Sequence, residues 1–298
     1  MKRKRVRNKY DAMAQGGGTM KRSDGTRLTS LDPFVEMIPY IMERRSDAQN
    51  FAKRIFFTEP IDRYILEKKE EGRQLRYLHL FIAASVRVLA ERPQLNRFIM
   101  SSRIYQRKGI SISMAIKRSF REDGEETTVK FQFTGQETIF EMAQIIDAEI
   151  AKALSHTATE EDQLIQTMMS LPHFVKKILV KTLKGLDKLN LLPESLIKIS
   201  PFHTSLFITH LKSIKSDYIF HHLYDFGTTG IFIALGKNMD LPVVEGHSIV
   251  IKNCVQVGIT TDERICDGVY MTRSFRLLEK YISDPKLLEQ RPARPVSE

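Results

Sequence analysis

The chain of 298 residues has few cysteines and no long apolar run. Its two cysteines, Cys254 and Cys266, are too few for a disulfide framework and do not have Cys-x-x-Cys spacing, so we expect a reducing, cytoplasmic location and no metal site. No run reaches 18 apolar residues, so the sequence predicts no membrane-spanning helix. The basic start is not followed by an apolar segment, which argues against a secretory signal.

Positive charge is concentrated at the N-terminus. Residues 1–30 hold nine Lys or Arg and two Asp or Glu, a net charge of +7, whereas residues 31–298 hold 37 and 34, a net charge of +3. Because residues 1–29 also lack apolar periodicity, we predict a disordered tail there, and a second tail over residues 286–298. The near-neutral body offers no basic face, so nucleic acid or a membrane surface is expected to bind only through the N-terminal tail.

The region between the tails mixes helical and strand patterns. Helical spacing predicts helices near 33–42, 61–69, 75–90, 139–150, 160–190 (two) and 268–283. The 75–90 helix has little polar surface and should be largely buried, and Thr134 to Glu137 has the form of a capping box. Alternation predicts strands at 52–58, 207–210, 230–235, 248–252 and 255–261, and a hairpin over 110–134 that turns at residues 121–124. One α/β (α+β) domain built on a mixed β-sheet, spanning residues 30–285, follows from this order.

The adjacent pair His221 and His222 could supply acid–base chemistry or contact a substrate. In an extended segment the side chains of neighbouring residues point to opposite faces, so the two would not bind one metal ion together. A purely structural role is the other interpretation.

The most informative stretch lies near the C-terminus. An alternating strand ends at Thr261, a short polar loop follows, and a helix begins at Asp267-Gly268. A carboxylate at this position can cap the helix and hold a neighbouring side chain in place. A plain strand-to-helix turn would have the same periodicity.

This loop resembles the His-x-x-x-Asp-Gly motif of the chloramphenicol acetyltransferase superfamily. In the 2-oxo acid dehydrogenase acyltransferases the motif has the form Asp-His-Arg-x-x-Asp-Gly. Asp262, Arg264, Asp267 and Gly268 match that pattern. The segments 225–236 and 92–96 and the closing helix are also similar to the family. The resemblance covers roughly residues 30–285 and is specific in the C-terminal third.

The resemblance implies a two-layer α/β sandwich that assembles as a homotrimer. It also implies transfer of an acyl group from a coenzyme A thioester, through a channel between subunits, to a small acceptor. In the family the motif histidine is the general base, the motif aspartate is structural, and a serine or threonine binds the oxyanion. Ser205 is the best placement of that hydroxyl group, and Thr209 is the second.

The sequence departs from the family at the base position, which is Glu263. Carboxylates have a reference pKa far below that of imidazole, so Glu263 is a weaker base unless its site is desolvated. Two hypotheses follow: an acyltransferase that uses Glu263 or recruits His210, His221 or His222, and a catalytically inactive trimeric binding or scaffold module. Lipoyl and subunit-binding domains are not expected. The candidate site comprises Glu263, Asp267 and Ser205 as catalytic residues, His221, His222 and Thr209 as substrate contacts, and Asp262, Arg264 and Gly268 as structural members.

Overall fold

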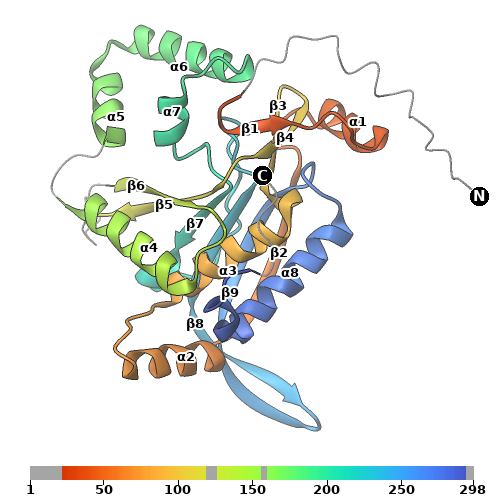
Figure 1. Cartoon of the computed structure of the whole chain (residues 1–298), viewed down its shortest axis with the longest axis vertical. Helices are drawn as coiled ribbons and strands as arrows, with labels where there is room; N and C mark the ends of the chain where they lie inside the picture. Colours follow the sequence, from red (N-terminus) through yellow and green to blue (C-terminus); the bar gives the residue numbers. More distant parts are fainter. Residues whose placement is uncertain (1–21, 119–125, 156–159, 293–298) are drawn as a thin grey trace, which may run out of the picture.

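A computed structural model describes residues 22–118, 126–155 and 160–292 (Figure 1). The predicted turn at 121–124 and most of the basic tail lie outside these ranges. The helices are α1 (Pro33–Ile41), α2 (Glu59–Glu70), α3 (Tyr77–Glu91), α4 (Ile139–Leu154), α5 (Glu160–Ser170), α6 (His173–Lys188), α7 (Glu194–Ile199) and α8 (Gly268–Ser283). The strands are β1 (Gly25–Arg27), β2 (Gln49–Phe57), β3 (Arg97–Met100), β4 (Arg103–Arg107), β5 (Ile110–Lys117), β6 (Glu126–Phe133), β7 (Leu206–His210), β8 (Ile231–Glu245) and β9 (Ser248–Asp262).

Six strands form one mixed sheet in the order β2-β9-β8-β7-β5-β6. Strand β7 runs parallel to β5 and β8, whereas the other neighbouring pairs are antiparallel. The predicted mixed sheet is therefore confirmed. A second sheet, β1-β4-β3, was not predicted, because its three- to five-residue strands are too short to show an alternating pattern.

Helices α3, α4 and α8 cover one face of the six-stranded sheet and form the second layer of the sandwich (Figure 1). Helix α3 is apolar all round, and nearly every residue from Leu78 to Ala90 is buried, as its composition predicts. The main core lies between this layer and the sheet, where Phe81 of α3 packs with inward-facing strand residues such as Phe131 and Val257. The fold is thus a two-layer α/β sandwich.

The other face of the sheet is covered in part by the extended segment 217–224. The segment crosses closely, because a Cβ on Gly258 would lie 2.1 Å from the carbonyl oxygen of Ile219, so only glycine fits there. Other apolar side chains on this side stay exposed, notably Phe51 (55%) and Ile55 (42%) of β2. The β8–β9 hairpin extends beyond the body (Figure 1). It also exposes apolar side chains.

The predicted boundaries of the domain were too narrow at both ends. Arg22 is buried, and residues 25–27 form β1 against β4, so ordered structure includes the end of the predicted N-terminal tail. At the other end, Leu288 is fully buried in the main core, although residues 286–298 were predicted to be a tail. Short apolar segments next to charged residues have no periodic pattern, so the sequence did not predict that these segments are ordered.

Two predicted local features also differ. The capping box of α4 is formed by Thr138 and Glu141, not by the residues 134–137, although Glu137 does accept hydrogen bonds from Thr134. The two strands predicted at 248–252 and 255–261 are one continuous strand, β9, since the polar residues between them pair with β8 without a break.

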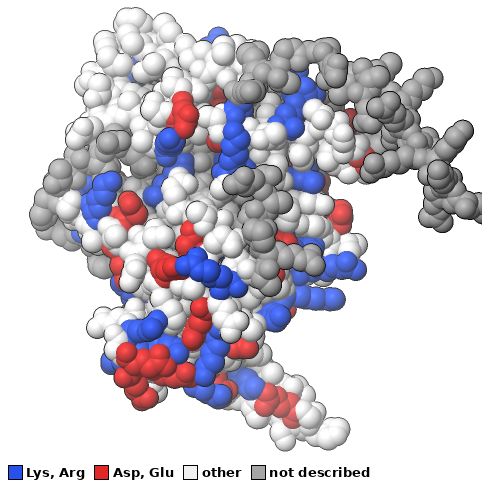
Figure 2. Space-filling view, in the orientation of Figure 1, with Lys and Arg blue, Asp and Glu red and all other residues white. Residues whose placement is uncertain are grey.

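Charge on the body is mixed in sign. In the view of Figure 2, acidic and basic side chains are interspersed, and neither sign dominates. Among the helices of the described ranges, none combines the length and the apolar character needed to cross a bilayer.

Candidate active site in the Glu263 loop

Glu263 lies on the wall of a groove of about 330 Å³ at the β2 edge of the sheet. The groove is formed by α1, the start of β2, the end of β9, the motif loop and the first turns of α8. Its lining residues are Ile38, Met42, Asn50, Ala52, Thr261, Glu263, Cys266, Asp267, Gly268, Met271, Thr272 and Phe275. Residues of the predicted motif therefore surround one concave surface.

The position of Glu263 follows from the alternation of β9. Val257 and Ile259 point into the core under the helical layer, and the same alternation puts Thr261 and Glu263 on that side. The Nδ2 group of Asn50 donates a hydrogen bond of 2.8 Å to Oε2 of Glu263, and the backbone of Glu263 bonds to Ala48. Asn50 was missed by the sequence analysis, because only the antiparallel pairing of β2 with β9 brings it to the motif.

The neighbouring Asp262 and Arg264 point away from the groove and pair with each other. Nε and Nη2 of Arg264 each donate a hydrogen bond of 2.8 Å to the carboxylate of Asp262, which is fully buried. Arg45 adds a second guanidinium at 3.5 Å. The guanidinium of Arg264 is therefore bound to Asp262 and is not directed at the Glu263 carboxylate.

Asp267 caps helix α8. Its side chain accepts a hydrogen bond of 2.9 Å from the backbone N–H of Tyr270, which satisfies one of the free donors at the helix start. Its carboxylate is exposed and forms no ion pair with Arg264. At Gly268 a Cβ would meet no atom within 4 Å, so the structure shows no steric reason for glycine in this position.

Cys266 also lines the groove, but it is not poised as a nucleophile. Burial, together with the nearby Asp267 carboxylate, raises the pKa of its thiol to about 12. Since the thiolate is the reactive form, Cys266 stays an unreactive thiol near neutral pH. The carboxylates of Glu263 and Asp267 therefore remain as the ionisable oxygen groups that line this groove.

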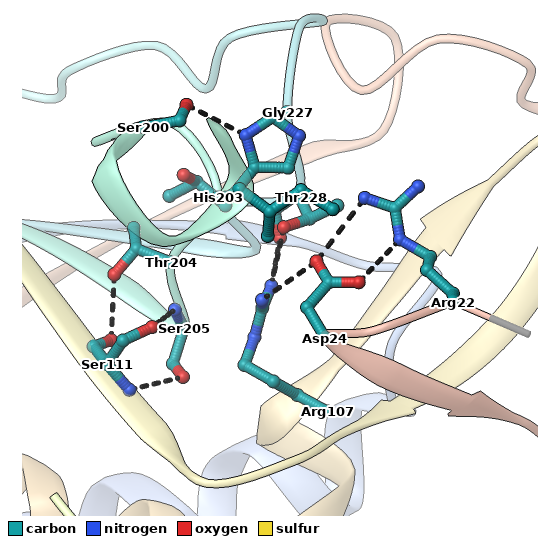
Figure 3. A network of polar contacts seen from close by, with 12 residues as sticks. Arg22, Asp24, Arg107, Ser111, Ser200, His203, Thr204, Ser205, Gly227 and Thr228 are labelled. Atoms are coloured by element: carbon teal, nitrogen blue, oxygen red, sulfur yellow. Dashed lines mark hydrogen bonds and ion pairs between the residues drawn. The ribbon is translucent and has the colours of Figure 1, made fainter. Parts of the chain in front are cut away.

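Ser205 and Thr209 lie elsewhere. Ser205 precedes β7, and β8 separates it from β9, so it lies roughly 10 Å to the side of the motif strand. Its Oγ accepts a hydrogen bond of 3.1 Å from the backbone of Ser111 and is buried (Figure 3). Thr209 is half-buried four residues further along β7. Within one protomer, neither hydroxyl reaches the Glu263 groove.

His221 and His222 lie on the face of the sheet opposite the helical layer. The ring of His221 stacks on Phe232 at 3.9 Å, and its Nδ1–H donates to the carbonyl oxygen of His222. Burial lowers the pKa of His221. The groove opens on the helical side, so the structure does not bring these histidines to Glu263.

A search of the described ranges found no group of three or more His, Cys, Asp or Glu residues that could hold a metal ion. A buried network near Ser205 was not predicted at all: Asp187, His203 and Arg22 are brought together there from distant parts of the chain. His203 lies 16 positions from Asp187 and Arg22 lies 165 positions from it. No sequence motif links the three residues, so the sequence pattern did not predict this network.

Comparison with known proteins agrees with the fold. Residues 228–289 match the sequence model of the 2-oxoacid dehydrogenases acyltransferase (catalytic domain). No match was found among curated protein sequences. Among solved structures, the cubic core of the pyruvate dehydrogenase multienzyme complex aligns with a TM-score of 0.56 and 13% identity, covering 86% of this chain and 88% of that one.

Two further structures have the same arrangement. Dihydrolipoamide acetyltransferase from Azotobacter vinelandii, studied for the catalytic roles of a serine, a histidine and an asparagine, aligns with a TM-score of 0.55, 13% identity, and coverage of 86% and 88%. A chloramphenicol acetyltransferase aligns with a TM-score of 0.52, 10% identity, and coverage of 87% and 99%. The chain therefore has the fold of the chloramphenicol acetyltransferase-like superfamily, and its C-terminal part is related to the acyltransferase catalytic domain of the 2-oxo acid dehydrogenases.

Proposed function

We propose that the protein transfers an acyl group from an acyl-coenzyme A thioester to a small thiol or hydroxyl acceptor, with Glu263 as the proton acceptor. The observation that carries the proposal is the groove: Glu263 stands at the base position of the motif, faces a concave surface and forms no ion pair with any residue that the structure describes. Oε2 is held by Asn50, and no hydrogen bond to Oε1 occurs in the described residues, so Oε1 is free to accept a proton.

The proposed transfer has two steps. The acceptor S–H or O–H gives its proton to Oε1 of Glu263 while its sulfur or oxygen attacks the thioester carbonyl. The tetrahedral intermediate then expels the coenzyme A thiolate, which takes the proton back from Glu263. Asn50 keeps the carboxylate oriented during both transfers, and the Asp262–Arg264 pair fixes the loop that carries it.

The groove is small compared with the complete substrates of the proposed reaction. A volume of about 330 Å³ is at the lower end of small-ligand sites, so it suits the reacting ends of the substrates more than a complete coenzyme A. Glu263 and Ser205 also belong to different strands of the sheet. A head-to-tail ring of subunits would bring different surfaces of two protomers together at one contact. We propose that a cyclic homotrimer completes the site in this way.

Exposed apolar side chains support this assembly. Val244 (70%), Ile249 (74%) and Ile251 (68%) on the β8–β9 hairpin are mostly in solvent in the single chain. Phe51 and Ile55 of β2 are also exposed, and exposed apolar surface of this kind is what subunit contacts cover. Sedimentation of the full chain should give three times the 34.4 kDa subunit mass, and Ile249→Asp should lower it, whereas Val269→Asp, equally exposed on α8, should not.

The activity test is thiol release from acetyl-CoA with dihydrolipoamide and simple alcohols as acceptors. If Glu263 is the base, Glu263→Gln should lower the rate by at least about 10²-fold, the usual size of general-base catalysis. Glu70→Gln, an exposed glutamate on α2, is the matched control and should keep the native rate. A rate unchanged in Glu263→Gln would contradict the assigned role.

The second candidate is a catalytically inactive trimeric binding or scaffold module. The specific observation in its favour is the missing imidazole: Glu263 stands at the histidine position, and His221 and His222 lie on the other face of the sheet. No thiol release by the native chain, combined with gain of release in Glu263→His, would favour this candidate.

A further inference from the structure

A second cavity of the described residues is larger than the Glu263 groove. It has a volume of about 690 Å³ and lies at the β6 edge of the sheet, between the β5–β6 hairpin, α4, α5, α7 and the loop before β7. The two concavities have no lining residue in common. Its volume is within the range of sites that enclose small organic ligands.

Basic side chains outnumber acidic ones around this cavity. Its lining contains five basic residues and three acidic ones: Arg107, Lys108, Lys130, Lys152 and Lys198, against Asp24, Glu149 and Glu194. Two of the carboxylates already form ion pairs: Asp24 pairs with Arg22 at 2.6 Å, and Glu194 pairs with Lys198 at 2.7 Å. The cavity therefore has an excess of positive charge.

Two of the lysines are available to a ligand. The ammonium groups of Lys108 and Lys152 form no ion pair or hydrogen bond with any described residue, and both side chains are exposed. Lys108 follows β4 and Lys152 lies on the last turn of α4, so they approach the cavity from different elements. Lys130 is held in the wall by the carbonyl oxygens of Ile197 and Ser200.

A buried guanidinium supplies an unused donor. The side chain of Arg107 is 3% exposed, and its Nη2 donates to the carbonyl oxygen and hydroxyl of Thr228 at 2.9 and 2.8 Å (Figure 3). Its Nε–H has no hydrogen-bond partner in the described part of the chain. An acceptor that reached this N–H would give it the partner that it lacks.

We propose that this cavity binds a small molecule that carries phosphate groups. Lysine ammonium groups on separate elements and a buried arginine surround the space, which suits a ligand with several negative charges better than a single carboxylate. The hydroxyl of Ser111, which also lines the cavity and accepts a bond from the backbone of Ser205, retains its proton for donation to a phosphate oxygen. The inference does not depend on any chemistry at Glu263, because binding needs no turnover.

The test is calorimetric titration of the full chain with coenzyme A, ATP and inorganic pyrophosphate, and with citrate as an anion without phosphate. We expect a Kd below about 1 mM for at least one phosphate ligand and weaker binding of citrate. Whichever ligand binds tightest identifies the source of the phosphate: a thioester carrier, a free nucleotide or an inorganic anion.

The variant Lys108→Gln/Lys152→Gln should raise that Kd at least tenfold. The matched control Lys69→Gln/Lys280→Gln removes the same charge from exposed positions on α2 and α8 and should change it less than twofold. Lysine labelling gives an independent readout: the ligand should protect Lys108 and Lys152, and not Lys69. Absence of binding by all three phosphate ligands, equal binding of citrate, or equal loss in both double variants would overturn the proposal.

Discussion

Two buried ion-pair networks hold the same loop, residues 224–228, and they are built differently. In the first, Arg45 donates to the carbonyl oxygens of Tyr224 and Gly227 and is paired with Asp262, which also binds Arg264. In the second, Arg107 donates to Thr228 and lies 3.7 Å from Asp24 (Figure 3). Arg22 pairs with both Asp24 and Asp187, and Asp187 also pairs with His203. The first network consists of arginine and aspartate alone, whereas the second contains a histidine.

This difference predicts different responses to pH. The first network contains no histidine, the side chain whose ordinary pKa lies between pH 5 and 8, so it should be insensitive there. Burial lowers the pKa of His203, although the Asp187 carboxylate opposes that shift. The neutral imidazole donates from Nε2 to Asp187 and accepts from the hydroxyl of Ser200 at Nδ1. The second network therefore couples the loop to protonation, and the first does not.

The largest effect on stability is expected from Asp262→Asn. The substitution leaves Arg45 and Arg264 buried without a countercharge, and breaking a buried pair in this way typically costs about 3–5 kcal/mol. Urea unfolding followed by circular dichroism measures the change. The control is Asp217→Asn, since Asp217 forms an exposed pair with Lys237 and should cost about 0–1 kcal/mol. Equal losses in both variants would show that Asp262 does not hold the loop.

The sequence pointed to two residues of the first network and to none of the second. Asp262 and Arg264 stand two residues apart in a motif, and the resemblance to the acyltransferases implies a structural role for both. Their pairing with each other, and that of Asp262 with Arg45, did not follow from the motif. The start of α8 at Gly268 and the burial of α3 also followed from local patterns. By contrast, Asn50 reaches Glu263 through strand pairing, and Arg22 reaches Asp187 across 165 residues. Long-range pairing is decided by the packed fold, which no local pattern encodes.

A smaller effect is expected from His203, and it concerns the pH dependence of stability. Its folded pKa lies below the unfolded value near 6.5, so the unfolded chain binds more protons as the pH falls below about 6.5. The free energy of unfolding should therefore decrease from pH 7 downwards. In His203→Gln this slope should be shallower by up to about 1.4 kcal/mol per pH unit.

The slope separates the two networks even if both variants are less stable than the native chain. Asp262→Asn should keep the native slope above pH 5, because no histidine belongs to its network. His247→Gln, at an exposed position in the β8–β9 turn, is the control for loss of a histidine. If His203→Gln had the native slope, the pH sensitivity would arise from another histidine, such as the half-buried His210, whose pKa desolvation lowers to about 4.

The smallest effect is expected at Asp267, which belongs to the same loop as Asp262 but to neither network. Because its exposed side chain caps α8 with one hydrogen bond, Asp267→Ala should cost about 1 kcal/mol in urea unfolding. Asp267→Asn should cost less than that, since asparagine caps helices as well as aspartate does. A loss of several kcal/mol in Asp267→Asn would mean that the carboxylate charge itself orders the loop. The bidentate pairing of Arg264 with Asp262, rather than with Asp267, argues against that outcome.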